Sequence, residues 1–166
     1  MAAESIHIRP AGAGDAEAIC AIYNQGIEDR NATLETRLRT TEEQRQWLAA
    51  RSERHPVLVA EEAGAVVGWG SLNPFNPRAA YDHVADFSVY VARSSRGAGV
   101  GRRLLTRLIE VAREIGYHKL VLAAFEWNVS GIALYTRMGF RHVGIYREQG
   151  LLDGRWVDTI VMEKLL

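Results

Sequence analysis

The sequence predicts an α/β or α+β fold in which helices cover a mixed central sheet. The strongest sign is the stretch 86–115, where an apolar run typical of a buried strand leads into a glycine-rich loop and an amphipathic helix. Strand-like and helix-like segments also alternate along the whole chain. A hairpin signal, Asp153-Gly154, lies between two alternating segments near the end. The 166 residues suit one domain covering 1–166.

In the first half of the chain, local sequence signals mark where the expected helices and strands begin and end. A strand is expected at 6–9, because apolar and polar residues alternate there before a proline. Asp15 is the expected cap of the first helix. Thr40 and Glu43 match a capping box and predict a second helix that ends near Arg54. The other elements expected in this half are a loop at 31–36 and strands at 57–62, 66–72 and 81–91.

In the second half, apolar residues recur at helical spacing over 100–115, and Gly116 is the expected end of that helix. Ser130 is the expected cap of a short helix that ends at Gly139. The remaining expected elements are strands at 119–124, 141–148 and 156–162. The predicted order is therefore one strand, two helices, three strands, a helix, a strand, a helix and two strands.

Composition excludes several classes of protein. The 20 basic and 20 acidic residues give zero net charge, which disfavours a nucleic-acid binder. The single cysteine, Cys20, permits no intrachain disulfide, and no Cys/His spacing indicates a metal site. The sequence shows no signal peptide and no apolar run long enough to span a membrane. We therefore expect a cytoplasmic protein that binds neither nucleic acid nor membranes.

The glycine-rich loop predicts a site for a phosphate-bearing ligand. Glycines let a ligand approach the backbone, and the first turn of a helix presents free N–H groups that attract anions. A P-loop is excluded because Arg102 and Arg103 follow Gly101, where a Lys-Ser/Thr pair is needed. A dinucleotide fingerprint is disfavoured by the G-x-G-x-G spacing and by the absence of a later acidic residue. A glycine turn that merely starts a helix remains an alternative.

The loop Arg96–Gly101 resembles a third motif, Arg/Gln-x-x-Gly-x-Gly/Ala, the pyrophosphate loop of the GNAT N-acetyltransferases. Asn128 and Tyr135 also match residues of that family's later helix, and Gly139-Phe140 matches the ending of that helix. The resemblance covers residues 6–164. It implies the GNAT fold, a mixed sheet of about seven strands flanked by about four helices, and acetyl-CoA (coenzyme A) as the cofactor.

A narrower resemblance is to the phosphinothricin, methionine sulfoximine and arsinothricin N-acetyltransferases. The segments that carry it are 24–28, 33–36, 77–81, 84–91 and 153–158. It implies acetyl transfer to the primary amine of a small amino-acid-like substrate, a role in antibiotic or herbicide resistance, and a homodimer.

The resemblance also implies roles for individual residues. Asp86 stands where the branch usually has a glutamate as general base, and Tyr135 is the expected acid. The implied cofactor-binding residues are Val89, Tyr90, Val91, Arg96, Gly97, Ala98, Gly99, Val100, Gly101, Arg102, Asn128 and Tyr135. The implied substrate-binding residues are Glu28, Thr33, Glu35, Arg78, Tyr81 and Asp86, with Trp156 and Asp158 as further candidates.

Two other functions stay open at this point. A non-catalytic acetyl-CoA sensor would keep the glycine loop without needing Asp86 or Tyr135. The other is an acetyltransferase acting on protein amino termini or lysines. A pocket gated by Arg78 and Tyr81 favours a small acidic substrate instead, because arginine makes paired hydrogen bonds to carboxylates.

Overall fold

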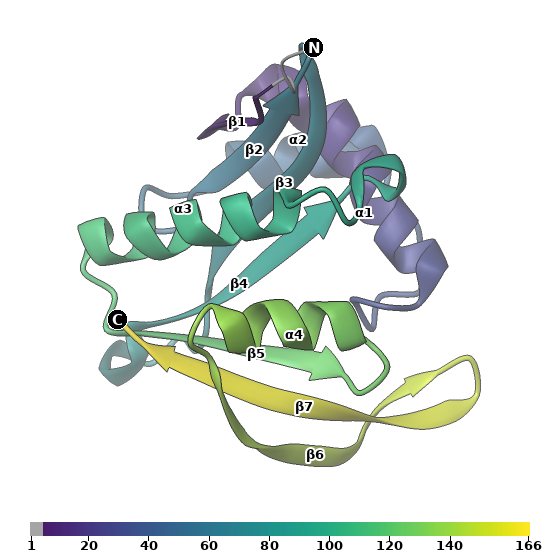
Figure 1. Ribbon diagram of the computed structural model, residues 1–166, viewed down its shortest axis with the longest axis vertical. Coiled ribbons are helices and arrows are strands. Elements are labelled where there is room, and N and C mark those ends of the chain that lie inside the picture. Colours follow the sequence, from purple (N-terminus) through teal and green to yellow (C-terminus); the bar gives the residue numbers. More distant parts are fainter. Residues whose placement is uncertain (1–4) are drawn as a thin grey trace.

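The computed structural model describes residues 5–166, which form a seven-stranded sheet with helices around it (Figure 1). The strands are β1 (His7–Pro10), β2 (Val57–Glu62), β3 (Ala65–Pro74), β4 (Val84–Val91), β5 (Lys119–Phe125), β6 (Arg141–Leu152) and β7 (Arg155–Leu165). The helices are α1 (Ala16–Asp29), α2 (Thr41–Ala49), α3 (Val100–Ile115) and α4 (Val129–Arg137), with short 3-10 helices at Ala13–Asp15, Ala79–Tyr81 and Arg93–Ser95. The predicted order of strands and main helices is confirmed.

The sheet has one parallel pair among the described strands, and that pair is short. The strand order is β1-β2-β3-β4-β5-β7-β6, and β4 runs parallel to β5. The two pair over three positions, from Val84 opposite Lys119 to Asp86 opposite Val121. Beyond Asp86, β4 stays with β3 and β5 stays with β7, so the two strands diverge (Figure 1). One edge of each strand is therefore left without a strand partner in the middle of the sheet.

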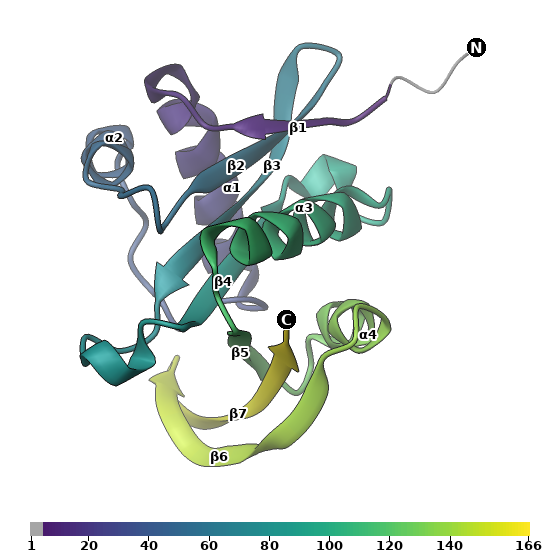
Figure 2. The same cartoon turned by 90° about the vertical axis from the view of Figure 1, so that its left-hand side faces the viewer.

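Helices cover both faces of this sheet. In Figure 2, α3 and α4 lie on one face and α1 and α2 on the other. Side chains alternate along β4: Phe87 packs in the core beneath α3, whereas Tyr90 packs in the cluster beneath α1. By the same alternation, Asp86 and Ser88 share the face of Tyr90. Within residues 5–166, no helix is long and apolar enough to cross a membrane.

Two of the expected helix boundaries are confirmed by their hydrogen bonds and dihedral angles. The N–H of Glu43 donates to Thr40 Oγ1 at 3.1 Å, and the N–H of Thr40 donates to Glu43 Oε2 at 2.8 Å. This is the predicted capping box of α2. Gly116 ends α3 with a φ of 102°, a left-handed conformation that glycine adopts without strain.

Other boundaries differ from the prediction because side chains make contacts that are distant in sequence. Helix α2 ends at Ala49 rather than near Arg54. Just after it, the Arg51 guanidinium turns toward β3 and donates to the carbonyl of Leu72 and, at 3.0 Å, to Asn73 Oδ1. These contacts draw the chain off the helix axis and toward the sheet.

The start of β4 was also predicted too early. Tyr81 lies in a 3-10 helix rather than in the strand, and its N–H donates to the carbonyl of Arg78 at 2.9 Å. The N–H of Asp82 likewise bonds to the carbonyl of Ala79 at 3.1 Å. Strand β4 begins only at Val84.

The two caps predicted at Asp15 and Ser130 have different outcomes. Asp15 is the N-cap residue of α1, as predicted, but its carboxylate accepts from the N–H of Gly12 at 2.7 Å and from the guanidinium of Arg9 instead of from the first turn of the helix. Asn128, not Ser130, caps α4, because its Oδ1 accepts from the N–H of Gly131 at 3.1 Å. Asp15 and Asn128 each accept a hydrogen bond from a backbone N–H three residues away. The local sequence pattern does not show which N–H such a side chain will bind.

Helix α3 lies close to β3 because two glycines of that strand carry no side chain. A Cβ on Gly68 would lie 2.9 Å from Val100 Cγ1, and one on Gly70 would lie 2.8 Å from Leu108 Cδ1. The Gly70 position is also 3.0 Å from the carbonyl oxygen of Ser88 on β4. The two glycines thus set how near the helix and its preceding glycine loop sit to the sheet.

We expect Gly70→Ala to lower the free energy of unfolding by about 1–3 kcal/mol, because the new methyl group overpacks the interface between α3 and the sheet. Denaturant unfolding measures the change. Gly14→Ala is the matched control, since a Cβ there meets nothing within 4 Å. Equal stability of the two variants would contradict close packing of α3 on β3.

Candidate active site

A cleft of about 250 Å³ lies where β4 and β5 diverge. The connection after α1, the edges of the two diverging strands, the start of α4 and strand β7 supply its walls. The cleft is lined by Ala32, Thr33, Leu34, Asp86, Phe87, Ser88, Val89, Tyr90, Leu122, Ala123, Ala124, Phe125, Asn128, Tyr135 and Thr159. It therefore brings together residues from across the sequence at the point where β4 and β5 part.

Asp86 is the acidic group of the cleft. It occupies the last position at which β4 pairs with β5. Burial raises the pKa of the Asp86 carboxyl to about 6, against the opposing effects of hydrogen bonds from the Asn73 side chain and the Phe87 backbone. A carboxyl with this pKa is mostly ionised at pH 7 and can accept a proton more readily than an ordinary aspartate.

Tyr135 reaches the cleft from α4. Its ring packs edge-on against Phe87, with centroids 5.8 Å apart, and against Phe140 at 6.0 Å. Burial, together with the charge of Asp86, raises the pKa of the Tyr135 phenol. The phenol therefore stays protonated at neutral pH and is suited to donate a proton or a hydrogen bond.

The glycine loop precedes α3 at the end of β4. Gly97 and Gly99 have φ values of 78° and 83°, so both need the left-handed conformation that glycine allows. A Cβ at either position would meet nothing within 4 Å, which means that the backbone there is open to a ligand. The helix that follows offers the N–H groups of its first turn to an anion.

Arg96, the first residue of that loop, already has an anionic partner. Its Nη1 lies 2.6 Å from Asp29 Oδ2, and its Nε donates to the carbonyl of Val91 at 3.3 Å. Arg93 pairs with the same carboxylate at 2.7 Å, and the two arginines lower the pKa of Asp29. The end of α1 and the glycine loop are thereby joined by ion pairs.

These features fit a long ligand that carries both phosphates and amides. The loop and the start of α3 can hold its phosphates. The edge of β4 beyond Asp86, free of a strand partner, can bond to amides of an extended chain as a neighbouring strand would. Acetyl-CoA has both groups. In the described part of the chain, His, Cys, Asp and Glu form no group of three placed to hold a metal ion.

The predicted cofactor-binding residues divide between two places. Val89, Tyr90, Asn128 and Tyr135 line the cleft, whereas Val91 and the segment 96–102 lie beyond it, at the end of β4 and the start of α3. Asn128 both lines the cleft and caps α4.

The predicted substrate-binding residues are not all brought together. Thr33 and Asp86 line the cleft. Glu28 instead contacts Arg93, at 3.3 Å, and Glu35 pairs with Arg39 at 3.1 Å. Arg78 and Tyr81 lie exposed on the connection between β3 and β4, and Trp156 and Asp158 lie on β7. The roles of these residues remain predictions.

The structure also shows functional candidates that the sequence did not indicate. The Thr159 hydroxyl on β7 is buried in the cleft wall, and its oxygen has no hydrogen-bond partner among the described residues. A single threonine in a strand of alternating polar and apolar residues does not indicate that its hydroxyl will be buried in a cleft. Ser88 likewise sits in the middle of an ordinary strand pattern.

A second cavity, of about 220 Å³, lies between helices α1 and α2 and the sheet, and we call it the α2 cavity. It is lined by Tyr23, Arg39, Glu43, Gln44, Trp47, Trp69, Asn73, Ser88 and Tyr90. Ser88 and Tyr90 line the cleft as well, so β4 forms a wall common to both cavities.

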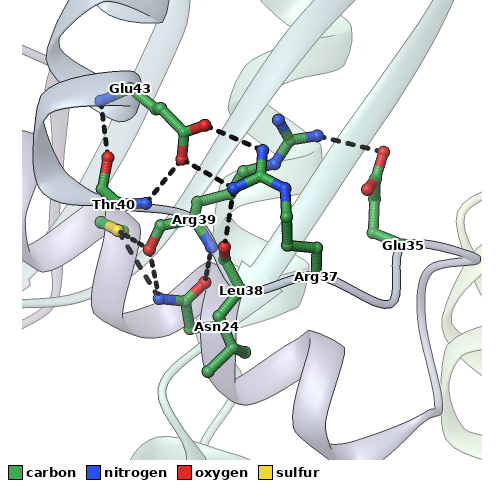
Figure 3. Close-up of polar contacts among 8 residues, drawn as sticks. Asn24, Glu35, Arg37, Leu38, Arg39, Thr40 and Glu43 are labelled. Atoms are coloured by element: carbon green, nitrogen blue, oxygen red, sulfur yellow. Dashed lines mark hydrogen bonds and ion pairs between the residues drawn. The ribbon is translucent and has the colours of Figure 1, made fainter.

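Polar contacts hold the segment that leads into α2, which contributes Arg39 to the cavity wall (Figure 3). The Asn24 amide bonds to both the N–H and the carbonyl of Arg39, each at 2.9 Å. The guanidinium of Arg37 pairs with Glu43 at 2.8 Å. Although this segment has no regular secondary structure, its path is fixed by side chains of α1 and α2.

Comparison with known proteins places the chain. A model described as the acetyltransferase (GNAT) family matches residues 20–140. An L-methionine sulfoximine/L-methionine sulfone acetyltransferase of Pseudomonas aeruginosa is 35% identical over 161 residues, 96% of this chain and 94% of the relative. A phosphinothricin N-acetyltransferase of Streptomyces coelicolor is 30% identical over 165 residues, 97% of this chain and 96% of the relative.

Solved structures agree. A ribosomal-protein-alanine N-acetyltransferase from Brucella melitensis superposes with a TM-score of 0.93 and 42% identity, covering 96% of this chain and 99% of that one. A GNAT phosphinothricin acetyltransferase from Sinorhizobium meliloti, in complex with AcCoA, gives a TM-score of 0.90 and 29% identity over 97% and 88%. The chain therefore belongs to the GNAT family of acetyl-CoA-dependent N-acetyltransferases.

Proposed function

We propose that the protein transfers the acetyl group of acetyl-CoA to the primary amine of a small amino-acid-like substrate of the phosphinothricin, methionine sulfoximine or arsinothricin type. The carrying observation is that Asp86 and Tyr135, a carboxylate with a raised pKa and a phenol kept protonated, line one cleft where β4 leaves β5. The names of the relatives support the substrate class. A role in resistance, a homodimer and a cytoplasmic location belong to the same proposal.

Each group has a distinct task in this proposal. Acetyl-CoA supplies the activated acyl group as a thioester. Asp86 accepts the proton that the amine must lose, directly or through one water, since aspartate is one methylene shorter than the glutamate usual in this branch. Backbone N–H groups of β4 beyond Asp86 stabilise the oxygen that gains negative charge. Tyr135 donates a proton to the departing thiolate.

Binding of the substrate carboxylate is assigned to Arg78, with Tyr81 beside it. Tyr81 packs edge-on against Phe75, with centroids 5.5 Å apart, which gives the connection between β3 and β4 an aromatic surface next to the arginine. A bidentate bond from a guanidinium suits an amino-acid carboxylate.

A second candidate function is acetylation of a protein amino terminus. The observation that favours it is the 42% identity to the Brucella melitensis structure, whose name specifies ribosomal protein alanine. The cleft favours the small substrate, because the segment 32–34 forms part of its lining and narrows the space left for a peptide.

A substrate panel separates the two candidates. We expect thiol release from acetyl-CoA with phosphinothricin, methionine sulfoximine or arsinothricin to have a kcat/KM at least about 100-fold above that with an alanine-terminated peptide, because the cleft recognises a small amino acid. The reverse order would replace the proposed function by the second candidate.

We expect the kcat/KM of the wild type to fall about tenfold per pH unit below pH 6, because the protonated Asp86 carboxyl cannot accept a proton from the amine. Asp86→Asn should lower kcat/KM by about 100-fold at pH 7 and remove this acidic limb. Asp82→Asn, at an exposed turn outside the cleft, is the matched control and should keep the wild-type profile. An unchanged profile in Asp86→Asn would remove Asp86 from the role of base.

Stability shows whether the Asp86→Asn variant is folded. Burial raises the pKa of Asp86 from 3.8 in the unfolded chain to about 6 in the fold, so the fold loses stability as the pH rises from about 4 to about 6 and does not regain it at higher pH. The variant should therefore gain about 1–3 kcal/mol in free energy of unfolding at pH 7, and this gain should vanish near pH 4. A loss of stability at pH 7 would mean that the hydrogen bonds of the Asp86 carboxylate outweigh the cost of burying its charge.

Tyr135→Phe should lower kcat by about 10- to 100-fold while KM for the amine changes less than about threefold, because the phenol acts on the leaving group. Steady-state kinetics measure both. Tyr146→Phe, on an exposed part of β6, is the matched control. A rise in KM with an unchanged kcat would assign Tyr135 to binding instead.

A further inference from the structure

The wall of the α2 cavity contains a buried hydrogen-bond donor that has no partner among the described residues, next to a buried amide side chain. Trp69 is 3% exposed, and its Nε1 makes no hydrogen bond within residues 5–166. Gln44, on α2, is 6% exposed and is the buried amide side chain of the cavity wall. Both residues line the cavity. Buried donors are normally paired, so the free N–H of Trp69 indicates a ligand atom that accepts its hydrogen bond.

The cavity walls are aromatic and carry no excess charge. Trp69 stacks on Tyr90 at 5.0 Å between centroids, and Trp47 meets Trp69 edge-on at 5.5 Å. The two charged residues of the wall, Arg39 and Glu43, are of opposite sign. Each already pairs with another residue, Arg39 with a glutamate at 3.1 Å and Glu43 with an arginine at 2.8 Å. An ionised ligand group would find no unpaired counter-charge here, whereas a neutral one is accommodated.

The cavity ends beside the proposed proton acceptor. Asn73 lines it, donates to Ser88 Oγ at 3.1 Å, and lies directly opposite Asp86 in the pairing of β3 with β4. One side chain therefore separates the cavity from the group that receives the proton of the amine. An amino acid whose amine lies at Asp86 can extend its side chain toward the cavity.

The size of the cavity suits one side chain. Its volume of about 220 Å³ is close to the 250 Å³ of the cleft, and it has room for a side chain of several heavy atoms.

We propose that the α2 cavity receives the side chain of the acceptor amino acid and selects neutral side chains that carry a hydrogen-bond acceptor, such as a carboxamide. The Trp69 N–H donates to the acceptor atom, and the Gln44 amide completes the pairing. This inference rests on the proposed function and narrows its substrate class toward the neutral members.

Three amino acids of similar shape test the selection: glutamine, glutamate and norleucine, each assayed by thiol release from acetyl-CoA. Wild type should show a kcat/KM for glutamine at least about tenfold above those for glutamate and norleucine, because a site built to hydrogen-bond rejects analogues that leave it unpaired. Gln44→Met keeps length and helix propensity but removes the amide. In this variant the preference for glutamine over norleucine should fall below about threefold, with norleucine itself changed less than about twofold.

The same loss of preference is expected for Trp69→Phe, which removes the indole N–H and serves as an independent variant. Gln46→Met is the matched control, because Gln46 lies two residues further along α2 with its side chain exposed, and it should keep the wild-type preference. Wild type that turns over amines without discriminating among the three, or a preference that survives in both cavity variants, would overturn this inference alone. No thiol release with any amino acid, analogue or peptide would overturn the proposed function and this inference with it.

Discussion

The parting of β4 and β5 after three paired positions is the constraint on which the rest of the structure depends. A sheet normally satisfies the backbone groups of its inner strands by pairing them on both sides. Here β4 keeps only β3 and β5 keeps only β7 beyond Asp86, so two strand edges face a gap inside the molecule. Helices lie on both faces of the sheet that contains this gap (Figure 2). An extended ligand with amide groups can take the place of the missing strand contacts.

Strand β4 gives the site its two-sided character. Its alternation sends Phe87 toward α3 and α4, where Tyr135 packs on it, and sends Tyr90 toward α1. Asp86 stands at the end of the paired region, where burial alters its acidity while the cleft keeps it accessible. Strand β4 thus carries Asp86 and contacts Tyr135 through Phe87. The same strand forms the wall between the cleft and the α2 cavity.

Much of this could be predicted from local sequence, and the rest depends on contacts that local sequence does not encode. The order of elements, the capping box at Thr40 and the end of α3 at Gly116 follow from periodicity and short-range hydrogen bonding. The cap of α4 was assigned to Ser130 because serine and asparagine compete for that role over two residues. The α2 cavity was not predictable. Gln44 lies on a helix of ordinary polar pattern and Trp69 on a strand of ordinary apolar pattern, and only the packing of α2 on β3 brings them together.

The ion pair between Arg96 and Asp29 has a thermodynamic consequence for any anion that reaches the glycine loop. Such an anion does not meet a free guanidinium, because Arg96 Nη1 already lies 2.6 Å from the Asp29 carboxylate. If the anion displaces Asp29, its net gain from Arg96 is the difference between two ion pairs rather than the full strength of one. The displaced Asp29 retains Arg93 as a partner, at 2.7 Å, so the exchange leaves no buried charge unpaired. The Asp29 carboxylate thus competes with any anionic ligand of the loop for Arg96, and the binding free energy that Arg96 contributes is lowered by that competition.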